Sequence, residues 1–288
     1  MAGLTVAALL WASSFVVLKA AMVHYHPYML IFGRLMVASI CFVPLFYRRR
    51  HLRPQPGALK YVLLMSICEP CLYFLFEVAA LQRTTASQAG MITAMLPLMV
   101  AIGAYLLLRE PLTAPVFFGF ALAVAGTVWL SLTGAATPSA PDPILGNVLE
   151  FLAMICAAGY ILSAKRLTAT FNFSPLMITA VQAVMGFMFY LPLIFLPGVD
   201  LQRHWEPDFL WAVLYLGAFI TMGAYGLYNY GISRVTAGQA AAFINLIPIF
   251  SVLLGWFFLD EQFTSHQYFA AVVILSGIYL SQGVGRRG

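Results

Sequence analysis

Ten apolar runs, each long enough to cross a membrane, follow one another along the 288-residue chain. A transmembrane α-helix needs about 20 mostly apolar residues. Only 9% of the residues are charged, against roughly 25% in a soluble domain, so lipid is the expected surrounding. The runs are continuous rather than alternating, which favours helices over the strands of a barrel. The expected spans are residues 4–23, 28–47, 59–81, 86–108, 115–132, 146–165, 175–197, 209–231, 238–259 and 266–283.

The basic residues predict how these spans are oriented. The loop at residues 47–60 is rich in Arg and Lys, as cytoplasmic loops are. With that loop inside, only Arg83 and Arg203 of the loop cations fall outside. The inside set is Arg48, Arg49, Arg50, Arg53, Lys60, Arg109, Lys165, Arg166, Arg234, Arg286 and Arg287. The sequence therefore predicts a multi-pass protein of the cell inner membrane with both termini cytoplasmic. The net charge of +5 reflects this topology, and no nucleic-acid partner is expected.

The second half of the chain repeats the first. A shift of 151 positions aligns residues 83–127 with residues 234–278 without a gap, and a shift of 148 aligns Pro27 with Pro175. The matched pairs include Arg83 and Arg234, Gln88 and Gln239, Pro97 and Pro248, and Glu110 and Glu261. Because each repeat has an odd number of spans, the second enters the membrane from the opposite side.

These features predict an all-α membrane protein of ten transmembrane helices, built as two inverted five-helix repeats. The first repeat covers residues 1–133 and the second residues 146–288, joined by a periplasmic linker at residues 134–145. Inverted repeats are typical of transporters, which bind solute at the repeat interface near mid-membrane. A duplicated scaffold without transport is the alternative.

Four ionisable residues lie well inside expected spans, where such residues are expensive and mark function. A rise of about 1.5 Å per residue puts three of them, Lys19, Arg34 and Glu77, in the outer third of the membrane. We therefore expect either a Lys19–Glu77 or an Arg34–Glu77 pair. Such a pair is a structural ion pair, or else an outer gate or a clamp for a zwitterionic solute.

The fourth residue, Glu69, falls near mid-membrane without a basic residue at its depth. Pro70 follows it and weakens the helix. Glu69, Tyr73 and Glu77 are spaced by four positions and so share one helix face. We expect this face to bind solute, with Glu69 able to carry a proton. The alternative is that Glu69 is a purely structural carboxylic acid.

Two prolines at repeat-related positions, Pro97 and Pro248, lie inside expected spans. Proline removes one helical hydrogen bond, so each is expected to kink its helix. Together with Pro70 they are candidate hinges for alternating access. The other interpretation is a fixed bend that only shapes the cavity.

Aromatic and amide side chains inside the spans predict a cavity for small amphipathic solutes. Trp11 lies well inside its span, whereas tyrosines near a span end can form an interfacial belt instead. The expected substrate-binding residues are Trp11, Ser14, Glu69, Tyr73, Gln88, Tyr225, Tyr228, Asn229 and Asn245.

Small residues line one face of the fifth expected span and recur in the tenth. Gly119, Ala123 and Gly126 share a face of the fifth span, and Gly277 lies in the tenth. Small residues let helices approach closely. The contact joins either the two halves of one chain or two protomers of a homodimer.

Two motifs carry a resemblance to a known family. One is the opening Leu10-Trp11-Ala12-Ser13-Ser14-Phe15 with Lys19, and the other is the segment at residues 94–113, which is echoed at residues 245–264. Both halves are similar to the EamA domain of the drug/metabolite transporter superfamily. Similar proteins export amino acids and other small metabolites, and some import sugars or nucleotide-linked compounds. The second half has Cys156-Ala157-Ala158-Gly159 in place of the Trp–Ser opening, so an equal contribution of both halves to a site is left open.

Other classes of function fit the sequence less well. The five histidines lie in loops or at span ends, and neither Gly-x-Ser-x-Gly nor His-Glu-x-x-His occurs, so no catalytic residue, metal site or cofactor is predicted. The predicted function is a secondary transporter that exports small amphipathic metabolites, such as amino acids, by alternating access around a central cavity. Its expected partners are a small-molecule solute and the lipid bilayer. The alternatives are a proton-coupled importer of a sugar- or nucleotide-like metabolite, and an intramembrane enzyme.

Overall fold

The computed structural model describes residues 2–49, 56–108, 114–199, 206–235 and 243–282. Within these ranges the named elements are all helices, and one isolated bridge joins Thr137 to Ala140. Several residues used in the predictions lie outside the described ranges: Glu110, Gln239, residues 238–242 of the ninth span, and Arg50, Arg53, Arg109, Arg203, Arg286 and Arg287.

Eight helices in the described residues are long and apolar enough to cross a membrane. A shorter apolar helix covers Phe243–Leu259, and α14, over the expected tenth span, is not among the eight. The expectation of an all-helical, multi-pass membrane protein is therefore confirmed. The elements are α1 (Ala2–Ala21), α2 (Pro27–Arg49), α3 (Ala58–Ser66), η1 (Ile67–Leu72), α4 (Tyr73–Leu81), α5 (Ala86–Ile92), η2 (Thr93–Met95), α6 (Leu96–Leu108), α7 (Ala114–Leu132), α8 (Pro143–Phe171), α9 (Pro175–Leu193), α10 (Pro207–Leu214), η4 (Tyr215–Ala224), α11 (Tyr225–Arg234), η5 (Phe243–Leu246), α13 (Ile247–Leu259) and α14 (Ser265–Gln282).

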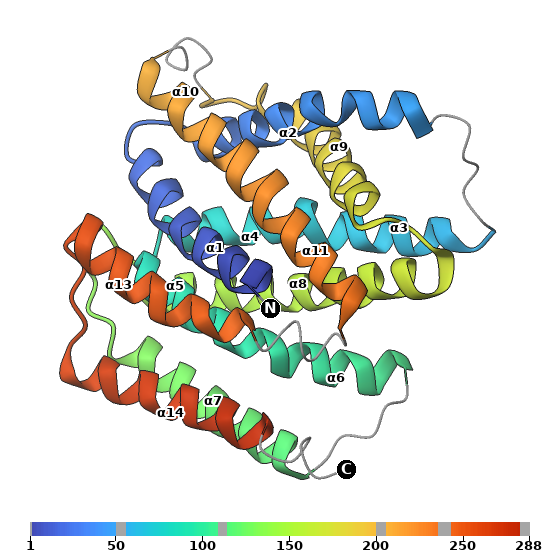
Figure 1. Cartoon of the computed structure of the whole chain (residues 1–288). Helices are drawn as coiled ribbons and strands as arrows, with labels where there is room; N and C mark the ends of the chain where they lie inside the picture. The colour runs from blue at the N-terminus through green and yellow to red at the C-terminus, as the bar shows by residue number, and fades with distance from the viewer. Residues whose placement is uncertain (1, 50–55, 109–113, 200–205, 236–242, 283–288) are drawn as a thin grey trace.

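The helices run back and forth between two ends of the molecule (Figure 1). α2 ends and α3 begins on the right of Figure 1, and α6 also ends on that side. The connections from α7 to α8 and from α13 to α14 lie at the opposite end. Large apolar side chains such as Phe117, Trp211 and Tyr279 are exposed. Exposed apolar surface and alternating direction are what successive crossings of a lipid bilayer require.

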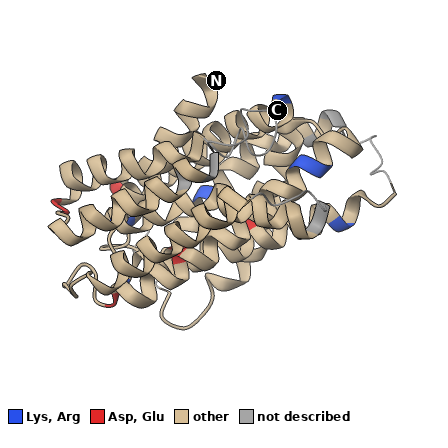
Figure 2. Ribbon diagram, turned by 90° about the horizontal axis from the view of Figure 1, so that it is seen from below, with Lys and Arg blue, Asp and Glu red and all other residues tan. Residues whose placement is uncertain are grey.

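The two ends of the molecule differ in charge (Figure 2). At the end where α3 begins and α8 and α11 finish, the charged residues whose side chains are described are Lys60, Lys165, Arg166 and Arg234. At the opposite end the acidic residues are Asp142, Glu206, Asp208, Asp260 and Glu261, with Lys19 and Arg83 as the basic exceptions. One end is therefore basic and the other mainly acidic.

Helix α8 is longer than the expected span 146–165. The Asp142 side chain accepts a hydrogen bond from Leu145 N at 3.1 Å, and Pro143 lies in the first turn; both are typical of helix starts. Asn172, with φ 52°, ends the helix in the left-handed conformation. The earlier start places Glu150 about two turns inside α8, which corrects the expectation of only four well-buried ionisable positions.

Several helices are interrupted. Glu69 has φ −149° and ψ 119°, so the helix over the third span breaks directly before Pro70. The π-helical segment η4 interrupts the helix over the eighth span. The 3-10 segments η2 and η5 precede the helices that hold Pro97 and Pro248. Each of these two prolines is the second residue of its helix. The N–H groups of the first turn make no intrahelical hydrogen bond, so proline costs none there. Kinks were expected at the two prolines. The structure instead has a short 3-10 segment directly before each proline-containing helix.

The small-residue faces of α7 and α14 pack against each other within one chain. A β-carbon at Gly277 would lie 2.5 Å from Gly119 O and 2.8 Å from Ala123 N, and one at Gly126 would lie 2.9 Å from Ile274 N. The glycines therefore allow the main chains of α7 and α14 to come into direct contact. These faces were expected to join either the two halves of one chain or two protomers. The structure contains the contact between the two halves.

Candidate functional site

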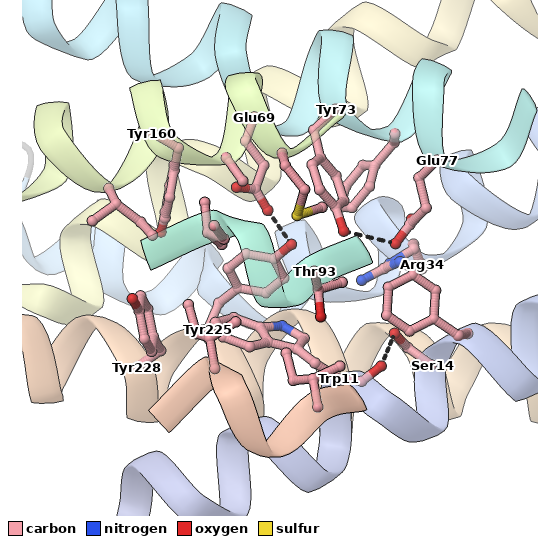
Figure 3. Close-up of a pocket in the computed structure, with 18 residues that line it drawn as sticks. Trp11, Ser14, Arg34, Glu69, Tyr73, Glu77, Thr93, Tyr160, Tyr225 and Tyr228 are labelled. Carbon is pink, nitrogen blue, oxygen red and sulfur yellow. Dashed lines mark hydrogen bonds between the residues drawn. The ribbon is translucent and has the colours of Figure 1, made fainter. Parts of the chain in front are cut away.

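A pocket lies between helices from both halves of the chain (Figure 3). It holds about 540 Å³ of empty space, including the part open to solvent. Side chains come from α1, α2, α4, α6, α8, α11 and α13 and from the short segments η1, η2 and η5. The lining residues are Trp11, Ser14, Phe15, Arg34, Glu69, Tyr73, Phe74, Glu77, Thr93, Leu96, Met154, Ala157, Tyr160, Ile161, Tyr225, Tyr228, Ile244 and Ile247.

Three charged side chains share this pocket, although each is almost fully buried. The exposed fractions are 1% for Arg34, 4% for Glu69 and 3% for Glu77. The Arg34 guanidinium lies 4.5 Å from the ring centroid of Phe74, and its Nε donates to Thr221 Oγ1 at 3.1 Å. Figure 3 shows the rest of the guanidinium directed toward Glu77. One cation therefore shares the pocket with two carboxyl groups and is directed toward one of them, Glu77.

A tyrosine holds each of these two carboxyl groups. Glu69, at the break in the helix, accepts a hydrogen bond from the Tyr225 hydroxyl of α11. Glu77 Oε1 accepts one from the Tyr73 hydroxyl at 3.0 Å. Glu69 is therefore tied to the second half of the chain, whereas Glu77 is held from its own helix.

An aromatic wall lies opposite the charged side chains. The Trp11 ring centroid is 5.1 Å from that of Tyr225 and 4.8 Å from that of Tyr228. Trp11 Nε1, the Tyr228 hydroxyl and Glu77 Oε2 are buried and have no hydrogen-bond partner among the described residues. An unpaired buried polar group costs about 1–3 kcal/mol. These atoms are therefore available to a bound molecule as two donors and one acceptor.

Most lining residues fall into pairs separated by a constant number of positions. Residues of α1 pair with residues of α8 that lie 146 positions later, and the other pairs are 151 positions apart. The pairs are Trp11 and Ala157, Ser14 and Tyr160, Phe15 and Ile161, Phe74 and Tyr225, Glu77 and Tyr228, Thr93 and Ile244, and Leu96 and Ile247. Equivalent positions of the two halves therefore face one space, but they differ in chemistry.

Six of the nine expected substrate-binding residues line the pocket: Trp11, Ser14, Glu69, Tyr73, Tyr225 and Tyr228. The three amides do not. Asn229 Oδ1 accepts a hydrogen bond from the hydroxyl of the lining residue Tyr160 at 2.9 Å. Gln88 accepts one from Asn147 Nδ2 at 2.9 Å, near the acidic end. Asn245 lies in η5, and its Oδ1 is buried without a partner among the described residues.

Lys19 lies away from the pocket, unlike Arg34 and Glu77. Its ammonium group donates to the main-chain oxygens of Leu81, Thr84 and Ser139, the last two at 2.6 Å. The Lys19–Glu77 pair expected from depth is therefore not formed. Carbonyl groups at a helix end lack intrahelical donors and attract a cation, and those of α4 take the ammonium group.

Sequence reasoning missed two polar residues of this region. Tyr160 lies 146 positions after Ser14, so an alignment of α1 with α8 would have found it. Glu150 is fully buried, and the capping residues Asp142 and Pro143 would have placed it about two turns inside its helix, rather than about one turn from the expected start at residue 146. The described residues contain no group of three or more His, Cys, Asp or Glu side chains that could hold a metal ion.

Comparison with known proteins places the chain in a family. A model described as the EamA-like transporter family matches residues 1–132 and 144–282. YetK, an uncharacterized transporter of Bacillus subtilis, is 30% identical over 72% of this chain and 64% of its own length. An uncharacterized transporter of Archaeoglobus fulgidus is 23% identical over 95% of this chain and 93% of its own. A chloroplastic WAT1-related protein of Arabidopsis thaliana is 25% identical over 94% of this chain and 66% of its own.

The fold also has a counterpart among solved structures. One crystal structure matches with a TM-score of 0.68 and 18% identity, over 99% of this chain and 96% of the other. At that identity the likeness shows a shared fold alone. The family model, by contrast, covers both halves of the sequence. The chain therefore belongs to the EamA-like transporter family and is a membrane transporter.

Proposed function

We propose that the protein is a secondary transporter that exports small zwitterionic metabolites, amino acids or similar, across the inner membrane. The observation that carries this proposal is the pocket in which Arg34 lies with Glu69 and Glu77 beside an aromatic wall. Arginine binds a carboxylate through two parallel N–H groups. A glutamate suits an ammonium group, and the rings of Trp11 and Tyr228 suit an apolar side chain. The outward direction follows the exporters that the chain resembles.

We also propose the finer architecture: ten spans, with repeats at residues 1–133 and 146–288 and a periplasmic linker at residues 134–145. The two family matches support this division because each falls on one repeat. The paired pocket residues support it as well, since a site at the interface of two repeats receives equivalent positions from both. The acidic and basic ends support cytoplasmic termini, because cytoplasmic loops carry the excess of Lys and Arg.

Two lysines support alternating access, because they hold opposite ends of the bundle in the same way. Lys19 donates to carbonyl oxygens at the end of α4. Lys165 donates to Ile232 O at 2.9 Å and Val235 O at 2.8 Å, at the end of α11. Lys165 lies 146 positions after Lys19, and its two acceptors lie 151 positions after Leu81 and Thr84. Release of one lysine would free one end of the transporter while the other stays closed.

Glu261 strengthens the closed outer end. Its carboxylate accepts hydrogen bonds from Ala86 N and Ser87 N, both at 2.8 Å, at the start of α5. Carboxylates are favourable at helix starts and ammonium groups at helix ends. The turn between α4 and α5 is thus held by Lys19 from the first half and by Glu261 from the second. Relative movement of the halves must break one of these contacts.

A counterflow assay tests the proposal. Purified protein is reconstituted into liposomes that contain unlabelled phenylalanine, and the entry of labelled phenylalanine into the liposomes is followed. Phenylalanine amide lacks the carboxylate, and N-acetylphenylalanine lacks the ammonium group, so both should exchange at least about tenfold more slowly, since each loses a charged contact. Arg34→Gln should remove the preference for phenylalanine over its amide. Tyr279→Phe, at an 81% exposed position, is the matched control and should exchange normally.

Three results would contradict the proposal. Equal exchange of phenylalanine, its amide and its N-acetyl derivative would show that the charged groups do not recognise a zwitterion. Counterflow of a sugar or a nucleotide in place of amino acids would assign the pocket to another class of solute. Net flux without acceleration by solute on the far side would indicate a channel rather than alternating access.

A further inference from the structure

A buried carboxyl group, Glu150 of α8, lies behind the pocket wall and takes no part in the contacts of the pocket. Its side chain is 0% exposed. Neither carboxyl oxygen has a hydrogen-bond partner among the described residues. Buried carboxyl groups normally have such partners, because an unpaired charge in an apolar interior is expensive. Glu150 therefore needs a proton or a bound cation.

The packing of α8 on α4 brings Glu150 close to Glu77. A β-carbon at Gly146 would lie 2.9 Å from Thr84 N and 3.1 Å from Ala80 O, so the two antiparallel helices are in close contact there. Glu150 is about one turn after Gly146 along α8, and Glu77 is about one turn before Ala80 along α4. The two glutamates thus face the same interface between α4 and α8.

Basic side chains do not reach Glu150 from the described helices around it. α4 contributes Glu77 and Tyr73, and the Tyr73 hydroxyl donates to Glu77. α5, η2 and α7 also pack on α8 and carry no titratable group. The groups on the remaining neighbours α3, η1, α6 and α11 are Lys60, Tyr61, Cys68, Glu69, Cys71, Tyr105, Tyr225, Tyr228, Tyr230 and Arg234. Among these, Lys60 lies at the start of α3 and Arg234 at the end of α11, at the end of the molecule where α8 finishes, whereas Glu150 lies near the start of α8.

The polar path to Glu150 leads through Glu77. On the side of the acidic end, Asn147 closes the space: its Nδ2 donates to Gln88 Oε1 at 2.9 Å, and its Oδ1 accepts from Thr84 Oγ1 at 2.8 Å. On the other side lies Glu77, whose Oε2 also lacks a partner among the described residues. Since Glu77 lines the pocket, a proton enters and leaves by way of the pocket.

We propose that Glu77 and Glu150 together bind one exchangeable proton, and that this proton is exchanged for the solute. Two neighbouring carboxyl groups in an apolar interior cannot readily both be ionised. The Arg34 guanidinium is directed toward Glu77, so it can offset the charge of one carboxylate of the pair but not of both. One proton between them forms an O–H bond to one oxygen and a hydrogen bond to another. A proton is favoured over a divalent metal ion, because calcium takes about six to eight oxygen ligands.

The exchange follows from the position of Glu77 on the pocket wall, and it rests on the proposed function. When the pocket is free of solute, the pair holds the proton. A solute ammonium group that binds at Glu77 competes with the proton, which leaves the carboxyl oxygen for water in the open pocket. Only the O–H bond is broken, and a new one forms on water. One proton therefore enters the cell for each solute molecule that leaves.

Glu150→Gln tests the proposal, because Glu150 lies outside the solute-lining set. In liposomes, a gradient of about one pH unit should sustain about a tenfold concentration ratio of phenylalanine for one-for-one exchange by the unmodified protein. Glu150→Gln should lose this ratio and keep gradient-free counterflow of phenylalanine. Asp208→Asn, at the exposed acidic end, is the matched control and should keep both. A ratio retained in Glu150→Gln, or driven by a sodium gradient instead, would overturn the proposal.

Infrared difference spectroscopy gives a second readout that needs no transport. The C=O band of a protonated carboxyl group should change between acid and alkaline pH in the unmodified protein, and both Glu150→Gln and Glu77→Gln should remove the change. Glu150→Asp should retain the change in the C=O band. This variant provides the readout if Glu150→Gln does not fold. A band present at every pH would identify Glu150 as a permanently protonated structural group. A shared titrating band without any counterflow would contradict the proposed function and leave the proton site intact.

Discussion

Removal of the Lys19 ammonium group should open the outer end of the transporter. Lys19→Met keeps most of the aliphatic chain but loses the hydrogen bonds to the carbonyl oxygens of Leu81, Thr84 and Ser139. These bonds require α1 to lie against the turn between α4 and α5. In the proposed alternating-access motion they therefore stabilise the closed state of the proposed outer end and contribute nothing once that end has opened.

The size of the effect follows from the number and kind of these bonds. A hydrogen bond to a charged group contributes about 1.5–3 kcal/mol. Lys19 is only partly buried, and water can replace the ammonium group at the freed oxygens. We therefore take a net loss of about 1.5–3 kcal/mol for all three bonds together. Each 1.4 kcal/mol is about a tenfold change in an equilibrium, so the outward-open population should rise roughly 10- to 100-fold.

Cysteine labelling measures this population. Ser14→Cys puts a thiol on the pocket wall in a background where the four native cysteines are replaced. A membrane-impermeant maleimide should then label Lys19→Met faster than its parent, by the same roughly 10- to 100-fold, in right-side-out vesicles. Lys165→Met is the mirror-image control and should speed labelling in inside-out vesicles only. Equal acceleration from both sides by Lys19→Met, or no acceleration, would refute the reasoning.

Three further outcomes are expected. A cysteine at Ser139 should react with an impermeant reagent from outside the cell and one at Lys60 should not; the reverse would invert the proposed orientation. Glu69→Gln removes a charge from the pocket, so the affinity for phenylalanine should fall roughly 10- to 100-fold in a binding assay while the response to a pH gradient persists; unchanged affinity would make Glu69 structural. Gly277→Ala should lower the melting temperature of purified protein, since its β-carbon would lie 2.5 Å from a main-chain oxygen, at a cost of about 1–3 kcal/mol. Gly226→Ala, with open space around its β-carbon, should not, and an equal loss in both variants would contradict the packing argument.

The positions of the spanning helices could be predicted from sequence because bilayer thickness sets the length of an apolar run. Their ends depend on local hydrogen bonds that hydropathy does not record. α8 begins at Pro143 because Asp142 caps it, so Glu150 lies about two turns inside the helix rather than about one turn from the expected start. The capping residues stood in the sequence, so this helix start was predictable from a rule that hydropathy leaves out.

The depth of a side chain could be predicted, but its neighbours could not. Lys19 and Glu77 have similar expected depths because each residue rises a fixed distance along a helix. The rotation and packing of the helices decide which groups meet, and no local pattern fixes these. Lys19 consequently lies on the end of α4, whereas Arg34 and Glu77 line the pocket. The break at Glu69 was foreseeable from Pro70, but the hydrogen bond from Tyr225, 156 positions away, was not.

The paired positions of the pocket have a consequence for how such a transporter acquires new solutes. After a duplication both walls begin alike, and a change in one copy alters the chemistry of the pocket while the other copy keeps its packing. Glu77 and Tyr228 are two such diverged copies, as are Trp11 and Ala157. Lys19 and Lys165, which hold the two ends, do not line the pocket, and this position is a lysine in both halves. Single substitutions in one half can therefore change the range of solutes. Related transporters that move in the same way should differ first at the paired positions of the pocket.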